Sequence, residues 1–131
     1  MNQEILDYIR FRGEQARETL VEARVLLDNR LLRGAVNRLY YACFYAVTAL
    51  LWTEGLSSPK HSGVRSLFDQ HWIKTGRVPV DMGRLFHMLF RFRHQGDYEQ
   101  VAFEPDKVQR LLEQASEFVD IANKCIEERL Q

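Results

Sequence analysis

The fold is decided by residues 34–54, which read GAVNRLYYACFYAVTALLWTE. Arg38 and Glu54 carry the only charges in this stretch, and aromatic side chains surround a seam of smaller ones. The seam steps by three and four residues, the period of an α-helix; its members are Ala35, Leu39, Ala42, Ala46 and Ala49. Because a helix that is apolar nearly all round must be covered on several sides, we expect it to lie at the centre of the protein.

Amphipathic stretches flank this central segment. Apolar residues alternate at spacings of three and four from residue 3 to residue 29, and again from about Pro105 onward. Shorter helices are predicted over residues 59–75, after Ser58, and 82–95, after Asp81. The pattern predicts an all-α, up-down bundle of about five helices. The side chains expected at its centre are Leu20, Leu39, Ala46, Leu89, Phe118 and Ala122.

Length and composition fit one domain spanning residues 1–131. Only 7 Gly and 3 Pro occur, which disfavours a turn-dense β-sandwich. The uncharged run that begins at Leu39 ends before Glu54, short of the roughly 20 residues that a membrane-spanning helix needs. Cys43 and Cys125 lack the spacing of a metal site. We therefore expect a cytoplasmic protein without a membrane segment, a metal or a cofactor.

The net charge of zero conceals an uneven distribution. Residues 30–93 hold ten Lys or Arg against three acidic residues, a net charge of +7, whereas residues 1–29 sum to −2 and residues 94–131 to −5. A polyanion would bind the basic middle segment. The alternative is that acidic outer helices pair with basic inner ones, so that the charges cancel within the fold.

The helix predicted over residues 82–95 carries a cationic stripe. At 100° per residue, Arg84, His87, Arg91 and His94 project within an arc of roughly 80°. Arg offers forked donors to phosphate oxygens, and His can donate or accept a proton, so the stripe suits a phosphate-bearing ligand. The alternative role is interhelical salt bridges with the acidic first and last helices.

The same helix carries aromatic residues away from its expected core face. Leu85, Met88, Leu89 and Phe92 define the core face, while Phe86 and Phe90 lie opposite. These two Phe residues therefore indicate a second buried surface, against either the first helix or a symmetry partner. We expect a homodimer that buries them or the aromatic residues of the central helix.

Other candidate features are weaker. The sequence has no P-loop, GxGxxG, HExxH or acidic metal cluster, which argues against ATPases, dehydrogenases and metalloenzymes. Tyr40, Tyr41 and Tyr45 have the chemistry to stack on bases, but aromatic residues of a central helix usually belong to the core. Residues 60–62 lie at a predicted helix N-terminus. The free backbone N–H groups there would either bind an anion or be capped in the ordinary way by nearby side chains.

Several segments together resemble the small prokaryotic HEPN domain family. They follow one another in the family's order and cover nearly the whole chain; they are residues 35–46, Ala49-Leu50-Leu51, Gly55, Lys60-His61-Ser62-Gly63-Val64, Phe68 and Arg93-His94-Gln95-Gly96-Asp97-Tyr98. The resemblance implies a helical bundle that is commonly dimeric and binds nucleotide or RNA. It also implies a possible neighbour, a minimal nucleotidyltransferase, with which the chain would form a toxin-antitoxin-like module.

The nucleases of that superfamily carry an Arg followed, after four to six residues, by a His, often with a Tyr two residues later. Counting back from Tyr98 assigns the Arg to Arg91 and the His to position 96, where this chain has Gly96. Arg65 and His71 have the same spacing but fall on different faces of one predicted helix.

We therefore predict a protein that binds RNA or nucleotide phosphate and is non-catalytic or weakly active. Its predicted ligand-binding residues are Arg84, His87, Arg91, Arg93, Asp97 and Tyr98. The alternative is a metal-independent HEPN endoribonuclease, a toxin, with Arg91 and His94 as its catalytic candidates.

Overall fold

A computed structural model describes residues 1–96 and 102–131, with the backbone alone for residues 94–96. Its elements are α1 (Gln3–Asp28), α2 (Leu32–Trp52), α3 (His61–Phe68), the π-helical segment η1 (Asp69–Ile73), α4 (Val80–Gly96) and α5 (Pro105–Leu130). The described residues contain no strand, so the predicted all-α fold is confirmed.

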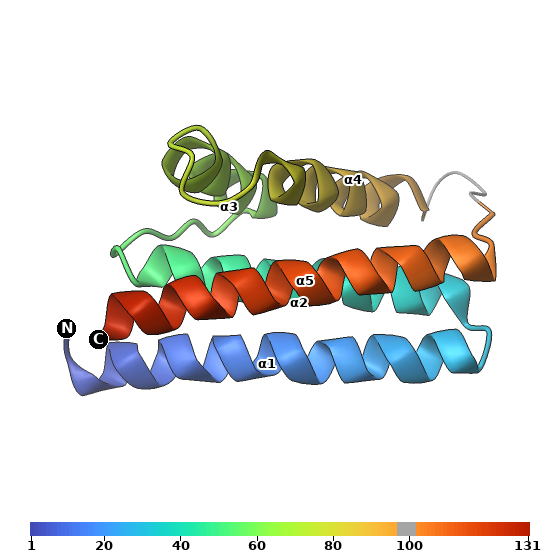
Figure 1. Ribbon diagram of the computed structural model, residues 1–131, viewed down its shortest axis with the longest axis horizontal. Helices are drawn as coiled ribbons and strands as arrows, with labels where there is room; N and C mark the ends of the chain where they lie inside the picture. The colour runs from blue at the N-terminus through green and yellow to red at the C-terminus, as the bar shows by residue number, and fades with distance from the viewer. Residues whose placement is uncertain (97–101) are drawn as a thin grey trace.

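Helix α2 lies at the centre, as its apolar surface predicts. It packs against α1, α5, α4 and α3. Figure 1 shows α1 along one side of the bundle, α2 and α5 in the middle, and the pair α3 and α4 on the opposite side. Both ends of the chain lie at the same end of the bundle (Figure 1). The pair α3 and α4 therefore meets α2 on the side away from α1.

The core forms where these helices meet. Of the six side chains predicted at its centre, five are buried and Leu20 is only partly buried, since it lines a shallow groove between α1 and α5. Four aromatic residues fill the space between α2, α3, α4 and α5; they are Tyr40, Phe68, Phe86 and Phe118. The ring of Phe86 lies between 5.8 and 5.9 Å from each of the other three rings, centroid to centroid.

The prediction that Phe86 lies on a dimer surface is therefore wrong. Its side chain is 1% exposed and belongs to the aromatic core of a single chain. The physical reason is that α4 packs against α2 and α5 and against α3, so its buried face is centred on Leu85, Phe86 and Leu89, with Met88 and Phe92 at its partly buried edge. Phe90, one turn further on, is only partly buried.

The helix predicted over residues 59–75 starts later than expected and changes its winding. Helix α3 begins at His61, because the Ser58 hydroxyl accepts a hydrogen bond from the Lys60 N–H at 3.2 Å and makes a local turn before it. From Asp69 the backbone widens into η1, which ends with a hydrogen bond of 2.8 Å from the Lys74 N–H to the Asp69 carbonyl. This five-residue step is the bond of a π-helix.

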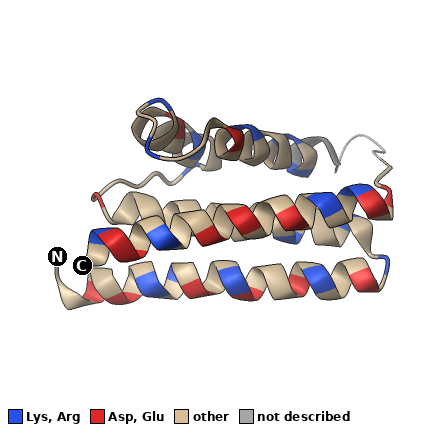
Figure 2. Cartoon of the chain, viewed as in Figure 1, with Lys and Arg blue, Asp and Glu red and all other residues tan. Residues whose placement is uncertain are grey.

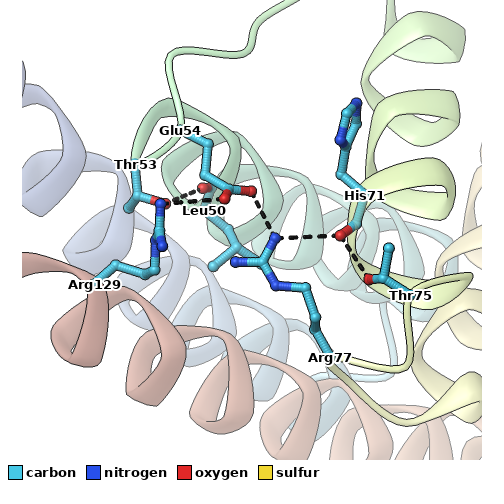
Figure 3. Close-up of polar contacts among 7 residues, drawn as sticks. All are labelled: Leu50, Thr53, Glu54, His71, Thr75, Arg77 and Arg129. Atoms are coloured by element: carbon cyan, nitrogen blue, oxygen red, sulfur yellow. Dashed lines mark hydrogen bonds and ion pairs between the residues drawn. The ribbon is translucent and has the colours of Figure 1, made fainter.

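Glu54, directly after α2, joins three parts of the chain. Its carboxylate accepts a hydrogen bond from Arg77 at 2.8 Å and pairs with Arg129 of α5 at 3.1 Å (Figure 3). Arg77 also donates to the carbonyl of His71, and its guanidinium carbon lies 3.5 Å from the centre of the Trp72 ring. The carboxylate thus ties the η1–α4 connection and α5 to the end of α2.

The outer helices carry most of the surface charge. Figure 2 shows basic and acidic residues interspersed along α1 and α5, whereas α2 is mostly uncharged. Arg17 of α1 pairs with Asp120 of α5 at 2.9 Å, and Arg38 of α2 pairs with Glu22 of α1 at 3.6 Å. Across the described parts of the chain, no helix is both long and apolar enough to cross a lipid bilayer.

Candidate phosphate-binding site

The cationic stripe predicted on α4 faces two different neighbours. Arg84, His87 and Arg91 are exposed, as a binding role requires. Arg84, however, pairs with Asp81 at 3.0 Å and lines the groove between α4 and α5, while His87 contacts α3. The structure therefore does not bring Arg84 and His87 together at one point.

Three predicted site residues lie at or beyond the end of α4, where the structure does not describe the side chains. The side chain of His94, and all of Asp97 and Tyr98, lie outside the described residues. Their proposed roles remain predictions from the sequence.

His87 is held by Arg65 of α3. The Arg65 Nη1 lies 2.6 Å from the His87 Nδ1. Because a guanidinium can only donate, Nδ1 accepts, and the proton of the neutral ring is then on Nε2. The Arg65 guanidinium carbon also lies 4.4 Å from the centre of the Phe90 ring, a cation–π distance. Arg65 therefore sits between His87 and Phe90, one turn apart on α4.

Arg93 approaches the same region from the end of α4. Its guanidinium carbon lies 5.2 Å from the Tyr41 ring centre and 5.7 Å from that of Tyr40. Its Nε is buried and has no hydrogen-bond partner in the described structure. A buried donor without a partner costs free energy, so an added acceptor would stabilise this arginine.

His61 connects this region to the core. The Tyr40 hydroxyl lies 2.9 Å from the His61 Nδ1, and the Phe44 ring stacks on the imidazole with 4.2 Å between centroids. Burial raises the pKa of the Tyr40 hydroxyl, which keeps the phenol neutral and able to share this hydrogen bond at physiological pH. The buried ring of Tyr40 thus fixes the position of His61.

Helical spacing explains why these side chains meet. His61 and Arg65 are four residues apart on α3, and His87, Phe90 and Arg93 are three residues apart on α4, so each set shares one face. In the sequence, His61 belongs to a predicted helix start and to the HEPN-like segments, and Arg65 is paired by spacing with His71 on a different face of its helix, so neither is a predicted site residue. Their four-residue spacing was the available signal, but which helix they face depends on the fold.

We call the resulting region the arginine–aromatic surface. It is defined by Arg38, Tyr41, His61, Arg65, His87, Phe90 and Arg93, from α2, α3 and α4. Arg38 belongs to it because its guanidinium carbon lies 5.0 Å from the centre of the Tyr41 ring. Every member is at least partly exposed.

Among the side chains that the structure describes, no ion pair joins α4 to α1 or α5. The ion pairs that join separate elements include Arg38 to Glu22, Arg17 to Asp120 and Arg129 to Glu54, whereas Arg84 of α4 pairs within its own helix. The alternative of interhelical salt bridges with α1 and α5 therefore does not account for the described cations of α4. No three His, Cys, Asp or Glu side chains in the described ranges come close enough to hold a metal ion.

Comparisons with known proteins agree with this architecture. Residues 9–125 match the HEPN domain. A UPF0332 protein of Thermotoga maritima is 44% identical over 96% of this chain and 94% of its own length. A protein of Methanocaldococcus jannaschii named "Putative toxin" is 32% identical over 99% of this chain and 97% of its own, and a second of that name in the same organism is 30% identical over 86% and 78%. The chain therefore belongs to the HEPN domain family.

Proposed function

We propose that this HEPN protein binds RNA through its phosphates at the arginine–aromatic surface, and that it binds RNA better than it cleaves it. Arg65, His87 and Arg93 would contact the phosphates, with Arg91 contributing from its exposed position on α4. Proteins that bind single-stranded nucleic acids combine partly exposed aromatic rings with arginines. The arginines bind the phosphates, and the bases stack on the rings.

The observation that carries this proposal is the hydrogen bond from Arg65 to the His87 Nδ1. It orients the imidazole with its Nε2–H available to donate to a phosphate oxygen. While Nδ1 accepts from Arg65, this ring has no free nitrogen to act as a general base. A nuclease needs a group that accepts the 2′-hydroxyl proton, so this tautomer supports binding over cleavage.

Gly96 supports the same conclusion from the sequence, since it stands where the nuclease motif of the superfamily would carry its His. The relatives named "Putative toxin" support a place in a toxin–antitoxin pair. The family resemblance supports a minimal nucleotidyltransferase as the partner.

The test is a titration of fluorescein-labelled single-stranded RNA by fluorescence anisotropy at low salt, with wild type, Arg93→Gln and Arg65→Gln. We expect each variant to bind about tenfold more weakly, because each loses a charged contact to phosphate. Arg84→Gln is the matched control and should bind as wild type does, since Arg84 pairs with Asp81. Titrations that stay flat for all four proteins would contradict the proposal and leave a protein-interaction module.

A second arm separates binding from cleavage. The same RNA, incubated with the protein in EDTA and resolved on a denaturing gel, should remain intact. Metal-independent cleavage that His94→Ala abolishes would instead establish the alternative, an endoribonuclease with Arg91 and His94 at its centre.

A further inference from the structure

A hollow lies next to the arginine–aromatic surface, since Phe44 lines it and stacks on His61. It has a volume of about 430 Å³ and is enclosed by the start of α1, the second half of α2 and the connection from α2 to α3. This volume lies within the range of small-ligand sites. The side chains that determine its character are Tyr8, Arg12, Phe44, Trp52 and Ser58.

Its walls are mainly aromatic. The Tyr8 and Trp52 rings meet edge to face, with centroids 5.3 Å apart and planes inclined by 68°. Phe44 lines the hollow and also stacks on His61, so one ring borders both the hollow and the arginine–aromatic surface. All three rings are partly exposed. A flat ligand entering the hollow would therefore meet aromatic side chains.

The rim of the hollow is held in place by close packing. A Cβ atom at Gly63 would lie 2.0 Å from the Ser58 Oγ, so the absence of a side chain on α3 lets the α2–α3 connection approach it closely. From α1, Arg12 donates a hydrogen bond to the Tyr8 hydroxyl at 3.1 Å. These two contacts fix the side chains around the hollow.

A path of rings and arginines joins the hollow to the proposed phosphate site. The Arg12 guanidinium carbon lies 5.3 Å from the centre of the Tyr45 ring, and the Tyr45 and Tyr41 centroids are 5.8 Å apart. Tyr41 in turn lies under Arg93. Neighbouring arginines and aromatic rings therefore connect the hollow to Arg93 along the surface of α2.

We propose that this hollow holds an unpaired nucleobase whose attached phosphates lie on the arginine–aromatic surface. The inference rests on the proposed phosphate-binding function and adds the part of the ligand that the arginines do not contact. A nucleobase is flat, stacks on aromatic rings whatever its identity, and is linked to the phosphates that the neighbouring cations attract. The guanidinium of Arg12, at the rim, suits the backbone of the same ligand.

The test compares two oligomers on the wild-type protein. One is a short single-stranded oligoadenylate, and the other has the same backbone length but no bases. We expect the oligoadenylate to bind about tenfold more tightly, because base–aromatic stacking is lost in the abasic oligomer. It should also quench the fluorescence of Trp52, which is partly exposed, while Trp72 is buried. Adenosine 5′-monophosphate is tested in the same way. If it also quenches Trp52, the hollow can bind the base of a free nucleotide as well as a base of RNA.

Variants locate the base. Trp52→Ala should bind the oligoadenylate as weakly as the abasic oligomer, and Trp52→Phe should keep the affinity but lose the fluorescence change. Val80→Ala, an exposed apolar residue at the start of α4, is the control and should change neither. Circular dichroism confirms that each variant is folded.

Equal affinity of the wild type for the two oligomers would overturn the inference, as would a preference for bases that Trp52→Ala leaves intact. Failure of the proposed function looks different. In that case neither oligomer binds at low salt, or Arg93→Gln binds the abasic oligomer as well as the wild type does.

Discussion

The hydroxyl of Tyr40 lies 2.9 Å from the Nδ1 of His61, and this contact joins the aromatic core to the surface of the protein. Tyr40 is fully buried among Phe86 and its neighbours, whereas His61 is partly exposed at the start of α3. The position of α3 relative to α2 is thus tied to a core side chain, and Arg65, one turn along α3, is positioned with it.

Tyr40→Phe removes this hydrogen bond and keeps the ring. We expect the free energy of unfolding at pH 7 to fall by about 1 kcal/mol, as urea unfolding would measure. Burial raises the pKa of Tyr40, so above about pH 10 the phenol ionises in the unfolded state before it does in the folded state. The wild type should therefore lose its advantage as the pH rises beyond this value. Tyr45→Phe, on the partly exposed face of α2, should show neither effect.

Glu54→Gln tests the junction at the end of α2. The hydrogen bond from Arg77 lowers the pKa of this carboxyl below its ordinary value of 4.5. The ionised form therefore stabilises the fold above that pH, and its contribution is lost as the pH falls through the lower folded-state value. We expect a loss of about 1 kcal/mol at pH 7 that shrinks as the pH falls below 4.5. Urea unfolding of Glu18→Gln, an exposed change on α1, should give no such pH-dependent gap.

Leu39→Ala tests the packing of the central helix. Leu39 is fully buried, so the substitution should lower the free energy of unfolding by about 2 to 5 kcal/mol. Leu31→Ala, at a side chain that is 57% exposed, should cost less than about 0.5 kcal/mol. Similar thermal midpoints for the two variants would show that Leu39 is not in a close-packed core.

The homodimer predicted from the sequence remains to be tested. With Phe86 in the core, the remaining candidates are Phe90 and the partly exposed aromatic residues of α2, which the proposed RNA site also uses, so a dimer through them and RNA binding there would exclude each other and the mass is measured without RNA. Light scattering should give a mass of twice 15.5 kDa at micromolar concentration, and Phe90→Ser should shift it toward the single-chain mass. Val80→Ser should leave the mass unchanged. A single-chain mass for the wild type throughout the micromolar range would refute the dimer.

The sequence predicts the three long helices well because burial of one face imposes a period that can be counted along the chain. The same count fails for Phe86, since a helical projection gives the angle of a side chain but not which neighbouring helix covers it. The winding of η1 was missed for a related reason, because residues 69–73 fit an ordinary helix by composition.

The site was predicted only in part. The stripe on α4 is evident from spacing, and His87 and Arg93 lie in the arginine–aromatic surface. Arg65 and His61 come from another helix, and their approach to α4 depends on how α3 packs against α2. Arg84 belongs to the predicted stripe but does not join this surface. It forms an ion pair with Asp81 of its own helix instead.

The most direct test of phosphate binding at the arginine–aromatic surface is the salt dependence of the affinity for single-stranded RNA. If three phosphates are neutralised, log affinity should fall against log salt with a slope of roughly −2, and Arg93→Gln should bring the slope to about −1.4. Arg91→Ala should likewise lower both affinity and slope, whereas Arg84→Gln should keep the wild-type slope. A slope near zero for the wild type, or one that Arg93→Gln leaves unchanged, would contradict the account.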